Sequence, residues 1–203
     1  MKAFRFTILV LTLLSAEAYG FGTGYSSYPL APNKRLLSAE FTGVTSVGGG
    51  VGVQGRYTQK VNKQVSVDAG LGISGGKRTS RLFLGADYMI IPDYSKQPRI
   101  SVKGTIMNAK DFGQRRNSIA FAPTISKGFS FWGTEGFPFL SLPYGVHLNS
   151  DNNSYETTLN ANLGMTGNLP IEGYRHLTGS IEGSIDLKDS YTGIFASVTF
   201  PLN

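Results

Sequence analysis

The sequence predicts an all-β fold, an antiparallel up-and-down transmembrane β-barrel of about ten strands. Three observations predict it. First, apolar side chains alternate with polar or small ones from Gln64 to Ser74, and again from Ser80 to Ile91 after a Gly-rich turn. Second, about ten such segments follow one another, with Gly, Pro, Asn or Asp between them. Third, the apolar face of these segments carries no Asp, Glu, Lys or Arg, although 16% of the chain is charged.

Residues 1–18 are expected to be a secretory signal peptide and not part of the fold. Lys2 and Arg5 give a positive start, residues 6–14 are apolar, and Ala16-Glu17-Ala18 matches the A-x-A cleavage pattern. The apolar run is shorter than the about 20 residues that a spanning helix needs. Residues 19–34, rich in Gly, Pro, Ser and Tyr, are expected to form an N-terminal lead-in.

Residues 35–203 are expected to form the transmembrane β-barrel as a single domain, because no shift of composition divides them. The chain has no cysteine, which leaves no disulfide framework and no thiol-ligated metal site. The expected strands are residues 36–47, 50–61, 64–74, 80–91, 99–107, 118–126, 139–148, 155–166, 177–187 and 191–200.

The two faces of the expected strands differ in a way that favours a membrane barrel. One face is rich in Leu, Val, Ile, Tyr and Phe, and the other in Gly, Ser, Thr and Asn. A soluble sandwich or a lipocalin-like barrel also alternates, but it places large apolar residues in a closed core and charges outside. A membrane barrel turns its apolar residues to lipid and its polar ones to the lumen. The charged residues expected to face the lumen are Glu40, Arg56, Lys60, Asp68, Arg81, Asp87, Arg99, Lys103, Glu156, Glu182 and Asp186.

Neighbouring strands are expected to pair some of these charges. Folding the first two strands about Gly49 sets Glu40 opposite Thr58, with Arg56 and Lys60 as its diagonal neighbours. Cross-strand and diagonal neighbours are close enough to interact. We therefore expect ion pairs between the first two strands on the lumen side.

The next connections extend this charge network. A short connection sets Asp68 opposite Thr58, and folding about Ser95 sets Asp87 opposite Lys103. Barrels of eight strands are filled by side chains, whereas open channels are typical of about 16 to 18 strands. A barrel of about ten strands is therefore predicted to have a plugged lumen with at most a narrow pore. Such a lumen favours a role in surface structure or adhesion over bulk diffusion.

Aromatic residues agree with two membrane interfaces. Tyr57, Tyr88, Tyr144 and Tyr155 lie at or near the ends of expected strands, where amphipathic rings suit the boundary between lipid and water. An aromatic cluster in a soluble core is the alternative. Further aromatic residues gather around one connection, namely Phe129, Phe131, Trp132, Phe137 and Phe139.

The last expected strand carries the most specific pattern. It begins with Tyr191, has Gly193 two residues later, and alternates through Val198 to the terminal aromatic Phe200. With the signal peptide and the short turns, this pattern resembles small bacterial outer-membrane β-barrel proteins, without pointing to one subfamily. The resemblance implies the outer membrane of a Gram-negative bacterium, contact with its lipid and lipopolysaccharide, and recognition of the closing strand by the barrel-assembly machinery. The chain departs from the family pattern in that residues 201–203 follow Phe200.

An N-terminus in the periplasm and an even strand count would place residues 75–78, 110–117, 151–154 and 188–190 outside the cell. Two of these connections are basic. Arginine pairs bidentately with phosphate oxygens, so these residues are candidates for contact with lipopolysaccharide, and solvated turn charges are the alternative. The basic residues concerned are Lys77, Arg78, Lys110, Arg115 and Arg116.

No enzyme, cofactor or metal site is predicted. Residues 50–55 match G-x-G-x-x-G, but strand alternation continues where a dinucleotide-binding helix would have to begin. The basic residues are scattered, which does not favour nucleic-acid binding.

His147 and Ser150 resemble the His and Ser of lipid A deacylases, but their spacing differs by one residue. An enzyme acting on lipid A, a small porin-like channel and a soluble periplasmic ligand-binding barrel remain alternatives. The oligomeric state is not predicted.

Overall fold

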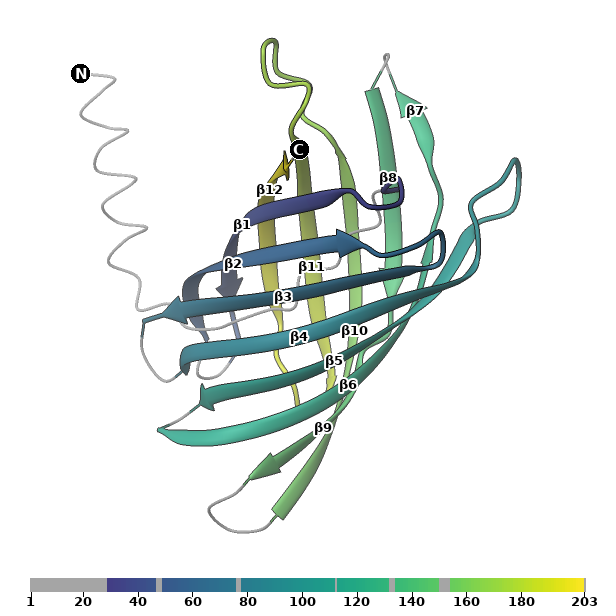
Figure 1. Ribbon diagram of the computed structural model, residues 1–203. Helices are drawn as coiled ribbons and strands as arrows, with labels where there is room; N and C mark the ends of the chain where they lie inside the picture. Colours follow the sequence, from purple (N-terminus) through teal and green to yellow (C-terminus); the bar gives the residue numbers. More distant parts are fainter. Residues whose placement is uncertain are drawn as a thin grey trace, which may run out of the picture.

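The computed structural model describes residues 29–46, 49–75, 78–111, 113–131, 134–149 and 154–202. They form a closed antiparallel β-barrel of ten strands (Figure 1). The ring closes where β1 (Arg35–Val44) pairs with both β2 (Gly50–Lys60) and β12 (Gly193–Leu202). The expected signal peptide and residues 19–28 of the expected lead-in lie outside the described residues. No helix in the described part of the chain is long and apolar enough to cross a membrane.

The remaining walls of the ring are built from hairpins. Each strand pairs with the next along the chain, so the topology is up and down. The prediction of an all-β barrel with about ten strands is confirmed. The strands of these hairpins are β3 (Val65–Ser74), β4 (Arg78–Ile91), β5 (Arg99–Asp111), β6 (Gln114–Ser126), β10 (Ser154–Asn168) and β11 (Thr178–Lys188).

One wall of the barrel is made by two shorter strands in series. β8 (Thr134–Ser141) and β9 (Tyr144–Asn149) both lie between β6 and β10, in the same register. The break falls at Pro143, which has no N–H to donate to a neighbour. Its carbonyl still accepts the N–H of Asn160 at 3.0 Å, so the wall stays bonded through the break.

Residues 127–138, which fall between the expected strands 118–126 and 139–148, are largely strand. β7 (Phe129–Phe131) pairs with the first residues of β8 as a short hairpin. The expected loop at residues 110–117 is also wrong. β5 and β6 continue to a tight turn in which Gly113 has a φ of 82°. Charged side chains interrupt the apolar alternation here, but the backbone ladder continues past them.

The distribution of side chains is the reverse of a soluble core. Large apolar residues point outward, and Leu71 and Leu163 are 65% and 66% exposed. Inside, polar and charged residues predominate, with Thr42 and Glu182 at 0% and 1% exposure. A few apolar side chains lie inside as well, among them Phe139 at 2%. Phe139 was expected in an aromatic girdle at the surface, and that expectation is wrong because its place in β8 puts it on the inner face beside Ala122.

Candidate functional site in the barrel lumen

The centre of the inner charge network is Arg56 on β2. Its Nε lies 2.8 Å from Oε1 of Glu40 on β1, and its Nη2 donates a hydrogen bond of 3.1 Å to Oε2. Its Nη1 donates to Oδ2 of Asp68 on β3 at 3.2 Å. All three side chains are buried. Because Arg56 binds two carboxylates from different strands, it joins three adjacent walls of the barrel.

Asp68 is shared with a second cation from across the next strand. Lys103 Nζ on β5 lies 2.6 Å from Asp68 Oδ2, passing over β4 at Gly85. A Cβ at Gly85 would lie 2.3 Å from Asp68 Oδ1 and 3.0 Å from Lys103 Cε. The absence of a side chain at this position is therefore what allows the two charges to meet.

The registers test the expected pairings one by one. Asp68 lies opposite Thr58, as predicted. Asp87 lies opposite Lys103, also as predicted, but its ion pair is made with Arg99. The lysine reaches Asp68 instead, since Gly85 leaves the diagonal path open.

The expected register of the first hairpin is wrong. Glu40 lies opposite Gln54 and not Thr58, and Gln54 Nε2 donates a hydrogen bond to Oε2 of Glu40. The centre of the hairpin lies two residues before Gly49, which shifts the partner of Glu40 by four residues. Several glycines in succession allow more than one turn, so the sequence alone does not settle this register. Arg56 remains a diagonal neighbour of Glu40, whereas Lys60 does not.

A phenyl ring anchors the middle of the network. The guanidinium carbons of Arg56 and Arg81 each lie 5.0 Å from the centre of the Phe83 ring, a distance at which cations and aromatic faces attract. Phe83 is 2% exposed, and its ring fills the space that a Cβ at Gly70 would need. Phe83 was not predicted as part of the site. Its place between Arg81 and Gly85 on the polar face of one strand nevertheless indicates that its ring points into the barrel.

On the opposite wall, Glu182 is held by amide and hydroxyl groups. Asn162 Nδ2 on β10 donates to Oε1 of Glu182 on β11 at 2.6 Å. Ser184 donates to Asn162 Oδ1 at 2.8 Å. Asn162 was not predicted as part of the site, because the predicted lumen residues were selected by their charge and an amide is neutral.

Two further expected lumen charges, Glu156 and Asp186, lie toward the end of the barrel that contains the β5–β6 turn, here called the turn end. Glu156 forms an ion pair of 3.2 Å with Arg116 and is more than half exposed. Asp186 is exposed, and its Oδ1 accepts the backbone N–H of Ser190 at 3.0 Å. These two acids belong to the rim and not to the buried network.

Two of the predicted lipopolysaccharide contacts are brought together on the outer face of the turn end. Lys110 and Arg115 are exposed and lie directly opposite each other in the β5–β6 register. Arg115 Nη1 also donates to Asn108 Oδ1 at 2.9 Å. Arg116, next in sequence, faces inward to Glu156, because alternate residues of a strand point to opposite faces. Arg78 begins β4, and Lys77 lies outside the described residues.

The expected closing strand does close the ring. Gly193 begins β12, and Val198 lies opposite Ala39 of β1. Tyr191, just before the strand, packs edge to face against Phe195 with ring centres 6.2 Å apart. Phe200 is 44% exposed on the outer face. The strand does not end there, since Pro201 and Leu202 continue the pairing with β1.

His147 has a different serine neighbour from the one expected. It shares a hydrogen bond between its Nδ1 and the Oγ of Ser118, and it lies opposite Glu156 on β10. Ser150, the expected partner, lies outside the described residues. Ser118 is 4% exposed, so its hydroxyl is covered by the barrel wall.

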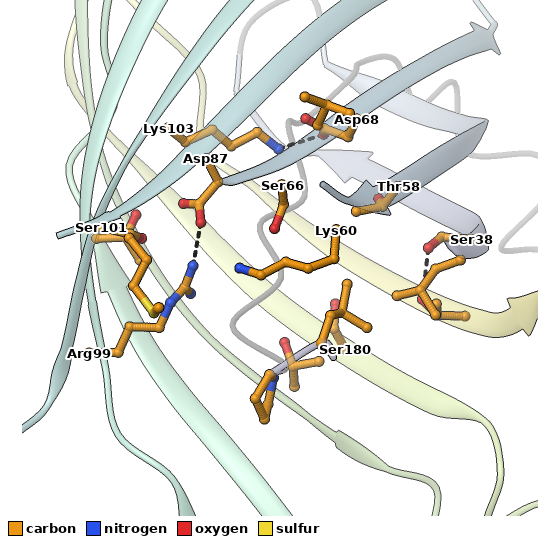
Figure 2. Close-up of a pocket in the computed structure, with 18 of the residues that line it drawn as sticks. Ser38, Thr58, Lys60, Ser66, Asp68, Asp87, Arg99, Ser101, Lys103 and Ser180 are labelled. Atoms are coloured by element: carbon orange, nitrogen blue, oxygen red, sulfur yellow. Dashed lines mark hydrogen bonds and ion pairs between the residues drawn. The ribbon is translucent and has the colours of Figure 1, made fainter. Parts of the chain in front are cut away.

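A cavity of about 270 Å³ lies inside the barrel at the end where β1 begins and β12 ends, here called the termini end. Leu36 and Thr199 are among its lining residues. The ion pairs of Asp68 and Asp87 form part of its walls (Figure 2). Lys60 reaches into it from β2. In the described ranges, no group of three His, Asp or Glu side chains is placed to hold a metal ion.

At the termini end, a clamp ties the β4–β5 turn to the segment after β6. Lys127 Nζ binds Asp93 Oδ1 and donates to the carbonyl of Ser95 at 2.6 Å, while Gly128 N–H donates to Asp93 Oδ2 at 2.7 Å. Partial burial by itself would raise the pKa of Asp93. The hydrogen bonds and the charge of Lys127 outweigh it, so the pKa lies below its ordinary value.

No protein-family model matches the chain, and no curated protein sequence matches it significantly.

Proposed function

We propose that this protein is an integral barrel of the bacterial outer membrane, without enzymatic activity, that serves surface structure or adhesion. In this proposal the charge network closes the lumen to bulk diffusion and leaves at most a narrow pore. Outer-membrane lipid surrounds the barrel, and the barrel-assembly machinery inserts it through the closing strand β12, which contains Val198 and Phe200.

The observation that carries the proposal is the apolar outer surface. Ile73, Leu84 and Ile181 are each more than half exposed, and similar residues recur around the ring. Soluble monomers rarely expose contiguous apolar patches larger than a few hundred Å². A closed barrel satisfies every backbone hydrogen bond without an edge, which is the condition for crossing lipid with strands. Lipid requires an apolar exterior, and the charged side chains can then lie only in the interior, where they pair with one another.

Membrane insertion is tested by expressing the full chain in a Gram-negative host. We expect it in the outer-membrane fraction after an alkaline wash, and we expect folded and boiled samples to migrate differently on a gel. Recovery of the folded protein in the alkaline supernatant would contradict the proposal and favour a soluble periplasmic barrel.

Closure of the lumen is tested separately in planar bilayers. Since the ion-paired side chains of Arg56, Asp68 and Lys103 are buried in the interior, we expect little or no steady conductance from the unmodified protein. A stable, large and well-defined conductance would move the function to a porin-like channel while leaving the membrane location intact.

A second function, hydrolysis of a lipid A ester, is favoured by one observation. The Ser118 hydroxyl is bonded to His147, with Glu156 opposite, which is the set of residue types used in nucleophilic catalysis. Two facts weigh against it, since Ser118 is buried and Glu156 pairs with Arg116. Comparing lipid A species by mass spectrometry in cells with the native protein and with His147→Ala separates the two functions, and we expect identical spectra.

A further inference from the structure

We propose that the cavity at the termini end is a binding site for a small oxyanion of the size of a phosphate group, held by Lys60. The site depends on the geometry inside the barrel and not on membrane insertion or on the surface role proposed above. Its walls come from β1 to β6 and from β10 to β12, so that the site exists only when the ring is closed.

Lys60 is the reason to expect an anion. Its side chain reaches into the cavity toward Arg99, yet the residue is only 6% exposed (Figure 2). Among the described residues no carboxylate lies within 4.0 Å of its ammonium group. A buried charge is costly unless it is paired. An anion bound beside Lys60 would supply the missing partner.

The carboxylates of the cavity are already engaged. Glu40 and Asp68 bind Arg56, and Asp87 binds Arg99. Asp93 binds Lys127, which is not part of the lining. The lining itself contains five basic and four acidic residues, so the charge left over is positive. This excess favours an anion over a cation in the same space.

The walls also supply donors of the kind that bind oxyanions. Arg99 uses Nη2 for its ion pair, and a guanidinium carries five N–H donors in all. Ser66 lies directly opposite Lys60 in the β2–β3 register and lines the cavity. Ser101 and Thr166 line it too, and their hydroxyls have no hydrogen-bond partner within the described part of the chain. Charge-assisted hydrogen bonds from such groups are the stronger kind.

The volume limits what binds. Pockets for drug-sized ligands occupy about 300 to 1,000 Å³, so a cavity of about 270 Å³ fits a small solute. The shared chemistry is a phosphate group, which is carried both by soluble phosphates and by lipid headgroups. Because the lining points into the lumen and the lipid-facing surface is outside, the soluble source is the one we expect.

The test titrates purified, refolded full-length protein with inorganic phosphate in Tris chloride at constant ionic strength. We expect saturable heat of binding, and a melting temperature that keeps rising with the logarithm of the phosphate concentration, because a ligand that binds only the folded state stabilises it. For Lys60→Met we expect affinity about ten- to a hundredfold weaker, the effect of losing one charge-assisted hydrogen bond. Without phosphate, this variant should melt at or above the native temperature, because an unpaired buried charge is gone.

The matched control is Lys188→Met, which removes an exposed lysine at the turn end of the barrel and should leave the affinity unchanged. Lys60→Arg, which keeps the charge, should retain binding. The lipid source is tested by comparing glycerol phosphate with short-chain phosphatidic acid in micelles. The proposal is overturned if phosphate does not saturate, if Lys60→Met binds like the native protein, if the control loses affinity equally, or if only the lipid binds.

Discussion

At the scale of single residues, glycines shape the interior as much as charged side chains do. Gly85 lets Lys103 reach Asp68, and Gly70 leaves room for the ring of Phe83. Glycine is ordinarily a weak choice in a strand because it packs nothing and loses entropy on folding. Here that cost is offset by ion pairs that a larger residue would prevent.

Replacement of Arg56 by Ala is expected to destabilise the barrel by about 3 kcal/mol, because it leaves buried carboxylates without their cation. The control is Lys63→Ala, which replaces an exposed lysine between β2 and β3 and should change the free energy of unfolding little. The double variant Glu40→Gln/Arg56→Met should be less destabilised than Arg56→Ala, since it removes both charges. Urea unfolding of the refolded proteins measures all three, and equal stability of Arg56→Ala and the native protein would contradict the role given to Arg56.

The Asp93 clamp makes stability depend on pH in a defined direction. A carboxyl whose pKa is lowered by folding stabilises the folded state above its unfolded pKa, and that stabilisation is lost as the pH falls. Asp93→Asn should therefore lower the melting temperature at pH 7. The difference from the native protein should shrink below about pH 4, where the aspartate of the unfolded chain becomes protonated. A difference that stays constant from pH 7 to pH 3 would show that the charge of Asp93 is not what the clamp uses.

At the scale of strands, local sequence decided the faces, but it decided the register only where one turn was clearly favoured. Period-two alternation is a property of one strand, which is why inward Glu40, Arg56 and Asp68 were predicted correctly. Register depends on the turn, and the run of glycines before Gly50 left several turns open. The break at Pro143 was also missed, since β8 and β9 keep one alternation across it.

The β5–β6 hairpin presents Lys110 and Arg115 together on its outer face, and it is the element in which lipopolysaccharide contact is most directly tested. Lys110→Ala/Arg115→Ala should weaken binding of purified lipopolysaccharide by about three- to tenfold, the loss of two exposed charge contacts. Arg116→Ala is the control, because that side chain faces Glu156. Equal affinity of the double variant and the native protein would show that these charges are solvated and do not contact lipopolysaccharide.

At the scale of the whole molecule, the outward apolar and inward polar faces follow from the sequence once ten strands are recognised, because alternation and closure together fix them. The internal contacts do not follow in the same way. Lys103 passing over β4, and Lys60 facing a cavity, depend on how distant strands meet around the ring. These are non-local relations that no single segment encodes.

The closure of the ring allows the chain to be circularly permuted. Arg35 and Leu202 are direct partners, and paired Cα atoms lie about 5 Å apart, so a short linker could join the two ends. New ends opened at Gly113, a turn with positive φ, would leave every inter-strand ladder intact. Such a circular permutant should refold in detergent with near-native stability. In cells it should fail to assemble, because the segment from Tyr191 to Phe200 would no longer lie at the end of the chain, and normal assembly would show that its position there is not what is recognised.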